Sequence, residues 1–147
     1  MSQLYQILLV EDDPLDADLT TRELKKIPLA NDILHHDTGD AALTWLQEQA
    51  QPEVAVILLD LNMPGMDGIE FLEHVKAAPN LRQIPVVVIT SSQEHPDVKR
   101  CYELGANAYV TKPVRRQAFK DAIRAVGLFW AVVNHPPVDI DPGFGPT

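Results

Sequence analysis

A single acidic residue, Asp60, closes a long apolar run in the middle of the sequence and is followed at once by turn-forming residues. The stretch reads VILLDLNMPGMDG from Val56 to Gly68. A carboxylate can act as a nucleophile and attack a phosphoryl donor, which gives an aspartyl phosphate. We therefore take Asp60 as the residue around which the chemistry of this chain is organised.

Two further carboxylates, one hydroxyl and one ammonium follow other short apolar runs. Carboxylates that crowd together repel one another unless a cation neutralises them. Oxygen ligands of this kind suit Mg²⁺, a hard ion that shares its coordination shell with water and phosphate. A hydroxyl and an ammonium beside them would offset charge on phosphoryl oxygens. The side chains in question are Glu11, Asp12, Thr90 and Lys112.

Apolar runs alternate with amphipathic segments along the chain. The runs are apolar along their whole length, as in parallel sheets that are covered on both faces. Five strands alternating with five helices predict a doubly wound α/β domain, in which functional groups gather at the carboxyl ends of the strands. The expected strands are Ile7 to Val10, Ile33 to His35, Val54 to Leu59, Val86 to Ile89 and Ala108 to Val110, and the expected helices are Pro14 to Lys26, Gly39 to Gln49, Asp67 to Ala77, Val98 to Leu104 and Arg115 onward.

Composition excludes several classes of protein. The 147 residues fit one domain, which we expect over residues 5–133, with a Pro/Gly-rich tail over residues 134–147. A net charge of −9 argues against binding of nucleic acid. No apolar run approaches the roughly 18 residues that span a bilayer, and the first residues are typical of a strand rather than a leader. The single cysteine, Cys101, suits the reducing cytoplasm.

Four motifs, taken in order, resemble the receiver domain of two-component response regulators. They are VEDD from Val10, LLDLNMPGMDG from Leu58, VVVITSS from Val86 and YVTKP from Tyr109. The similarity covers about residues 5 to 126. It implies a flavodoxin-like sheet with strand order 2-1-3-4-5 and a phosphoryl group supplied by a sensor histidine kinase.

The resemblance assigns the acidic residues to phosphorylation and metal binding. Asp60 matches the phosphoacceptor of the family. Glu11 and Asp12 match the acidic pair that binds Mg²⁺, with Asp12 as a direct ligand and Glu11 acting through water. The backbone carbonyl of Asn62 matches the third protein ligand. Asp13 lies one position beyond the pair, and we expect it to cap the first helix.

The same resemblance assigns the switch residues. Thr90 matches the hydroxyl that hydrogen-bonds the phosphoryl group, and Tyr109 matches the aromatic residue that changes rotamer with it. Lys112 matches the ion-pairing lysine, and the Lys112–Pro113 bond matches the family's cis peptide. Phosphorylation would then remodel the face formed by the fourth helix, the fifth strand and the fifth helix.

The last helix carries more apolar residues than one face of a sheet normally covers. They recur at the spacing found along the seam of packed helices. A large exposed apolar patch usually marks an interface. We therefore expect a homodimer, and the alternative is a tail that folds back onto its own domain. The residues are Phe119, Ile123, Val126, Phe129, Trp130 and Val133.

A second resemblance concerns the kinase partner. The ending GLFWAVVNHPP, together with EDDPLDADL and ELGANAYVTKPV, is similar to small response regulators that pair with cyanobacterial phytochromes. Those proteins are single-domain receivers, commonly dimeric, that a light-regulated kinase phosphorylates. Related receivers outside that pathway share the Phe-Trp ending, so both kinds of kinase remain open.

The sequence leaves two other functional classes open. A phosphatase of the haloacid-dehalogenase kind would use an aspartyl nucleophile with a second acid two residues later, where this chain has Asn62. A docking module that never turns over phosphate would not need the full set of Asp12, Asp60, Thr90 and Lys112. We expect a receiver without an output enzyme.

Overall fold

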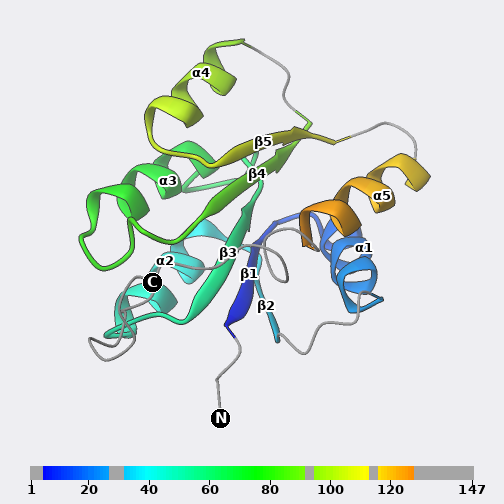
Figure 1. Cartoon of the computed structure of the whole chain (residues 1–147). Helices are drawn as coiled ribbons and strands as arrows, with labels where there is room; N and C mark the ends of the chain where they lie inside the picture. The colour runs from blue at the N-terminus through cyan, green and yellow to red at the C-terminus, as the bar shows by residue number, and fades with distance from the viewer. Residues whose placement is uncertain (1–4, 27–31, 92–94, 113–115, 128–147) are drawn as a thin grey trace, which may run out of the picture.

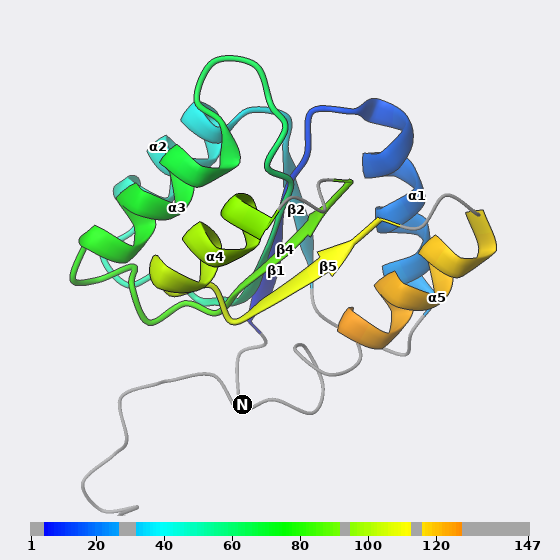
Figure 2. The same ribbon diagram turned by 90° about the horizontal axis from the view of Figure 1, so that it is seen from above.

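Five parallel strands form one sheet between two layers of helices (Figures 1 and 2). This computed structural model describes residues 5–26, 32–91, 95–112 and 116–127. The strand order is β2-β1-β3-β4-β5, which confirms the predicted flavodoxin-like topology. The elements are β1 (Gln6–Val10), α1 (Pro14–Lys25), β2 (Ile33–His36), α2 (Gly39–Glu48), β3 (Val54–Leu59), α3 (Gly68–Ala77), β4 (Val86–Thr90), α4 (His95–Glu103), β5 (Ala108–Thr111) and α5 (Arg116–Gly127).

The predicted elements match these bounds closely, and α4 differs most. The helix begins at His95, three residues before the predicted start at Val98. Pro96 lies in its first turn, where a missing backbone N–H costs nothing because the first turn has no helical acceptor for it. Within the part of the chain that the structure describes, no helix is both long and apolar enough to cross a membrane.

The core consists of two apolar layers, one on each face of the sheet. Successive side chains of a strand point to opposite faces, so β1 sends Leu8 and Val10 to one layer and Ile7 and Leu9 to the other. Helices α2, α3 and α4 cover the first face, and α1 and α5 cover the second (Figure 2). We call these the α2–α4 layer and the α1/α5 layer.

Helix α5 uses its apolar stripe to cover its own sheet. Phe119 and Ile123 are 5% and 0% exposed and pack in the α1/α5 layer. The prediction that these two side chains face a partner chain is therefore wrong, because the sheet already occupies that side of the helix. The side chain of Val126, the predicted continuation of the helix with Phe129, Trp130 and Val133, and the tail from residue 134 lie outside the described residues.

A buried ion pair joins α1 to α5. The carboxylate of Glu23, 1% exposed, accepts hydrogen bonds from Lys26 Nζ at 2.7 Å and from an Arg124 guanidinium nitrogen at 3.3 Å. The hydrogen bond from Lys26 holds the pKa of Glu23 below its usual value. Because it is paired with two cations, Glu23 can stay charged inside the layer, and both cations also reach solvent.

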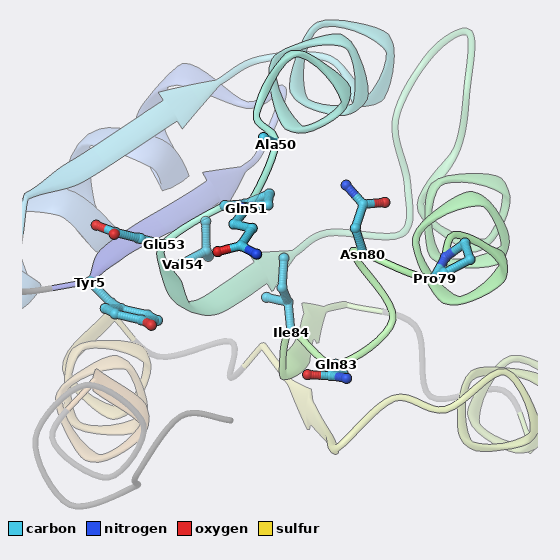
Figure 3. A pocket seen from close by; sticks show the side chains of 10 residues that line it. Tyr5, Ala50, Gln51, Glu53, Val54, Pro79, Asn80, Gln83 and Ile84 are labelled. Atoms are coloured by element: carbon cyan, nitrogen blue, oxygen red, sulfur yellow. The ribbon is translucent and has the colours of Figure 1, made fainter. Parts of the chain in front are cut away.

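A pocket of about 290 Å³ lies at the edge of the sheet where the strands begin (Figure 3). Its wall consists of Tyr5, the segment 50–54 that leads into β3, and residues of the segment between α3 and β4. None of the reactive residues predicted from the sequence lines it. The chemistry therefore belongs to the opposite edge.

Candidate functional site

Backbone hydrogen bonds between neighbouring strands bring the reactive residues to the carboxyl edge of the sheet. The Asp60 N–H donates to the Val10 carbonyl at 3.1 Å, and the Lys112 N–H donates to the Thr90 carbonyl at 2.7 Å. The first bond extends the pairing of β1 with β3 by one residue, and the second extends the pairing of β4 with β5. The side chains at these positions therefore start from the same edge, as the sequence predicted.

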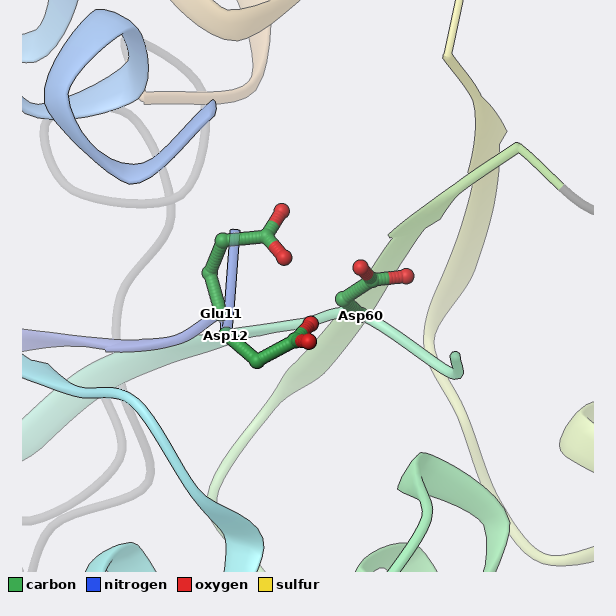
Figure 4. Close-up of side chains that lie close together, drawn as sticks. All are labelled: Glu11, Asp12 and Asp60. Carbon is green, nitrogen blue, oxygen red and sulfur yellow. The ribbon is translucent and has the colours of Figure 1, made fainter. Parts of the chain in front are cut away.

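Three carboxylates crowd together at this edge (Figure 4). Glu11, Asp12 and Asp60 each offer an oxygen, and these atoms lie within 4.8 Å of one another. Glu11 and Asp60 are buried at 4% and 6% exposure. Burial, together with the neighbouring Asp60, raises the pKa of Glu11 to about 8. Such a cluster of hard oxygen donors favours a divalent cation, whose charge would offset the repulsion among the carboxylates.

Lys112 reaches across the same edge. Its Nζ donates to Glu11 Oε1 at 2.7 Å, to Asp16 Oδ2 at 2.8 Å and to Asp60 Oδ2 at 3.3 Å. Burial alone would lower the pKa of Lys112, but the hydrogen bonds to Asp16 and Glu11 outweigh it and raise the pKa above its usual value. The ammonium is therefore permanently charged beside the expected phosphoacceptor.

Asp16 is the site residue that sequence reasoning missed. It lies in the first turn of α1, and its backbone N–H donates to the capping side chain of Asp13 at 3.4 Å. Asp13 also accepts from the N–H of Leu15 at 2.9 Å, which confirms its predicted role as the helix cap. The available signal was an acidic residue in the first turn of a helix that begins at the reactive edge.

The loop between β3 and α3 packs closely against Asp60. The Asn62 N–H donates to Asp60 Oδ1 at 3.3 Å. A Cβ at Gly68 would lie 2.4 Å from the Asp60 carbonyl oxygen, so only glycine fits there. Gly65 has a φ of +73°, which is the left-handed region that glycine favours. The Asn62 carbonyl as a metal ligand stays a prediction.

The predicted switch residues lie on the neighbouring strands. Thr90 is 0% exposed, and its Oγ1 accepts a hydrogen bond from Asn62 Nδ2 at 3.3 Å. Tyr109 is partly buried and packs against the α2–α4 layer. Pro113 lies outside the described residues, so the predicted cis peptide after Lys112 remains untested.

A hollow of about 370 Å³ opens beside the loop between β3 and α3. The hollow lies between that loop and α4. Asn62, which donates a hydrogen bond to Thr90, is one of the residues that line it. The lining residues are Leu61, Asn62, Met63, Asp67, Ile69 and Asp97.

The fold and this edge define a phosphoryl-accepting domain, and comparison with known proteins agrees. Residues 7–124 match the family model described as the response regulator receiver domain. The chain belongs to this family and is a phosphoryl-accepting switch of two-component signalling.

The similar proteins include phytochrome response regulators. Response regulator Rcp1 of Synechocystis sp. is 38% identical over 128 residues, which are 84% of this chain and 87% of Rcp1. The crystal structure of the Mn²⁺-bound form of Rcp1 has a TM-score of 0.86 at 36% identity, covering 91% of this chain and 99% of the other. Phosphorylated RcpA, a cyanobacterial phytochrome response regulator, has a TM-score of 0.86 at 30% identity, with 92% and 100% covered. The bacteriophytochrome response regulator AtBRR has a TM-score of 0.70 at 45% identity, with 91% and 100% covered.

Proposed function

We propose that Asp60 is the residue that accepts the phosphoryl group, from a phosphohistidine of a sensor kinase. A carboxylate oxygen of Asp60 attacks phosphorus, the P–N bond breaks, and its electron pair leaves with the imidazole of the kinase. The observation that carries this proposal is the Lys112 ammonium 3.3 Å from the Asp60 carboxylate, within a cluster of three acids. Neither a dehalogenase-like phosphatase nor a pure docking module accounts for this arrangement better.

Mg²⁺ is the cation that we assign to the carboxylate cluster. Glu11, Asp12, Asp60 and the Asn62 carbonyl would hold it, and when bound it would offset charge on the phosphoryl oxygens. Two observations support the assignment. The carboxylate oxygens lie within 4.8 Å of one another, and Rcp1 has been crystallised in a Mn²⁺-bound form.

Phosphorylation would act on Thr90 and Tyr109. Added negative charge at Asp60 favours hydrogen-bond donors that turn toward it. The Thr90 hydroxyl accepts a hydrogen bond from Asn62, and because a hydroxyl can accept and donate at once, its O–H can turn toward a phosphoryl oxygen. Tyr109 packs against the α2–α4 layer on β5, so its rotation would alter the face formed by α4, β5 and α5.

We assign the partner to the phytochrome-type histidine kinases. Support comes from RcpA and AtBRR, which are phytochrome response regulators that match this chain over their full length. We place the exchange in the cytoplasm, where the kinase meets ATP. We also propose a homodimer through the C-terminal residues Phe129, Trp130 and Val133, which continue the apolar stripe of α5 beyond Ile123.

Labelling by acetyl phosphate, with and without Mg²⁺, tests the phosphoacceptor. We expect Mg²⁺-dependent labelling of the parent chain and none of Asp60→Asn. Asp18→Asn is a matched control because Asp18 is 58% exposed and pairs with Arg22 rather than with the site; it should label like the parent. An acid-stable, alkali-labile label on Asp60→Asn would mean that another residue is the acceptor.

Molar mass by light scattering tests the dimer. Trp130→Glu should lower the molar mass toward that of one chain, because a charge cannot be buried in an apolar interface without a partner. Ala131→Glu, one position off the stripe, should leave it unchanged. If both variants keep the molar mass of the parent, the stripe has another role.

A further inference from the structure

Lys112 contacts one carboxylate, Asp16, that lies outside the acidic cluster predicted from the sequence. An ammonium has three N–H donors. In this structure they reach Glu11, Asp16 and Asp60 at 2.7, 2.8 and 3.3 Å. The lysine side chain is 13% exposed, and Asp16 is 33% exposed. Each donor therefore has its own carboxylate, and Asp16 has no role in the chemistry described so far.

The three acceptors differ in what else they would bind. Glu11 and Asp60 belong to the group of carboxylates that fits a divalent cation, and Asp16 does not. A cation that enters the group therefore competes with Lys112 for Glu11 and Asp60. Like charges that share ligands repel one another, and the repulsion is strong at a buried site. Lys112 needs an acceptor outside the group if it is to stay nearby.

We propose that Asp16 is a positioning residue that keeps the Lys112 ammonium beside Asp60 while Glu11 and Asp60 bind the divalent cation. The inference rests on the proposed function, because it assumes that cation and lysine serve the same phosphoryl transfer. Asp16 is well placed for this task. Its backbone is fixed in the first turn of α1, where its N–H donates to the Asp13 cap at 3.4 Å.

The arrangement has a chemical consequence. One N–H of Lys112 then donates to Asp16. When Glu11 and Asp60 bind the cation, the other two N–H groups can turn to phosphoryl oxygens. Without Asp16, the carboxylates of the cation group are the only partners that the described residues offer the ammonium. It would then oppose entry of the cation and would lose its fixed position once the cation is bound.

Mg²⁺ binding, measured by isothermal calorimetry, tests the proposal in a double-mutant cycle. The four proteins are the parent, Asp16→Ala, Lys112→Met and the double variant, with folding checked by circular dichroism. We expect Asp16→Ala to weaken Mg²⁺ binding about three- to tenfold, which lies in the lower part of the range of coupling between contacting residues. In the Lys112→Met background, which keeps the side-chain stem but removes the ammonium, the same change should have little effect.

Two controls separate positioning from simple charge. Asp18→Ala removes an equal charge from α1, but Asp18 pairs with Arg22 at 3.0 Å; Mg²⁺ binding should stay within about twofold of the parent. Asp16→Asn keeps an acceptor oxygen and should restore part of the affinity lost in Asp16→Ala. Equal losses in the parent and Lys112→Met backgrounds, or no loss in Asp16→Ala, would overturn the proposal.

Labelling of the same variants distinguishes this inference from the proposed function. Asp16→Ala should be labelled by acetyl phosphate several-fold more slowly than the parent at saturating Mg²⁺, and the residual label should still depend on Asp60. An unlabelled parent would contradict the phosphoacceptor assignment, whatever the calorimetry gives. A labelled parent with no coupling between Asp16 and Lys112 would contradict the positioning role alone.

Discussion

The two helical layers of this molecule stabilise the same sheet in different ways. The α2–α4 layer consists of apolar side chains such as Leu46, Phe71 and Leu72, all 0% exposed. The α1/α5 layer also has apolar contacts, but it contains the carboxylate of Glu23 with its two cations. Helix α1 further carries Asp16, which contacts Lys112 at the reactive edge.

This contrast separates stability from response. Apolar burial is non-directional and involves no group that binds a proton, a cation or a phosphoryl group. Buried charges require partners, and the strength of each pair changes when a proton, a cation or a phosphoryl group arrives. We therefore expect substitutions in the α2–α4 layer to change the free energy of unfolding, and substitutions of the charged residues of α1 to change how the protein responds to its surroundings.

The largest effect should come from Phe71→Ala in the α2–α4 layer. Phe71 is 0% exposed, and truncation of a buried Phe lowers the free energy of unfolding by about 3–5 kcal/mol. Urea denaturation measures it. Tyr102→Ala on α4, where the side chain is 50% exposed, should change it by less than about 0.5 kcal/mol. Equal losses in the two variants would contradict the assigned core.

Gly68→Ala should have the next largest effect and should also reach the site. The added Cβ would lie 2.4 Å from the Asp60 carbonyl oxygen and 2.6 Å from Leu61 Cα, so the backbone at Asp60 and Leu61 must move. We expect a loss of about 1–3 kcal/mol in unfolding free energy and slower labelling. In Gly39→Ala the new Cβ would lie 3.2 Å from the Met66 carbonyl oxygen. This variant should lose less unfolding free energy than Gly68→Ala and should be labelled at nearly the parent rate.

Cys101 offers a smaller probe of the α2–α4 layer. It is 0% exposed, and burial raises the pKa of its thiol to about 11. Cys101→Ala should lower the free energy of unfolding by about 1 kcal/mol, as expected for a small cavity. In the parent, iodoacetamide should modify the thiol slowly in buffer and rapidly in urea. Rapid modification in buffer would show that α4 often moves away from the sheet and exposes Cys101.

The smallest effect at neutral pH should come from Glu23→Gln in the α1/α5 layer. The pKa of Glu23 lies below its ordinary value of 4.5 in the folded chain. The folded state therefore binds fewer protons than the unfolded state, so this contribution to stability is present above pH 4.5 and is lost as pH falls through the folded pKa. When the free energy of unfolding is measured from about pH 7 to about pH 3, it should fall less steeply for Glu23→Gln than for the parent. If the unfolding free energy of the two proteins falls equally with pH, other carboxylates control the loss of stability in acid.

The carboxyl-edge residues could be predicted from sequence because one rule places them. Parallel strands end at a common edge, so Asp60 and Lys112 had to lie near each other once the strands were assigned. Asp16 could not be placed in the same way. Its contact with Lys112 depends on how far α1 is rotated against the sheet and on the direction of a long lysine side chain, and both follow from packing rather than from spacing.

The stripe on α5 illustrates a different limit. Phe119 and Ile123 recur at the spacing expected of a helix that packs against another surface, and this spacing is the same for a core and for an interface. The sequence predicted an apolar face correctly but could not identify its neighbour. In the structure the neighbour is the sheet of the same chain.

The contacts of Lys112 also have a consequence for synthesis of the protein. They join residues that are 101 positions apart for Glu11 and 96 positions apart for Asp16. A growing chain therefore cannot assemble the site until β5 has been made and has paired with β4, late in the formation of the sheet. Fragments that end before residue 112 lack this ammonium and therefore lack the complete site.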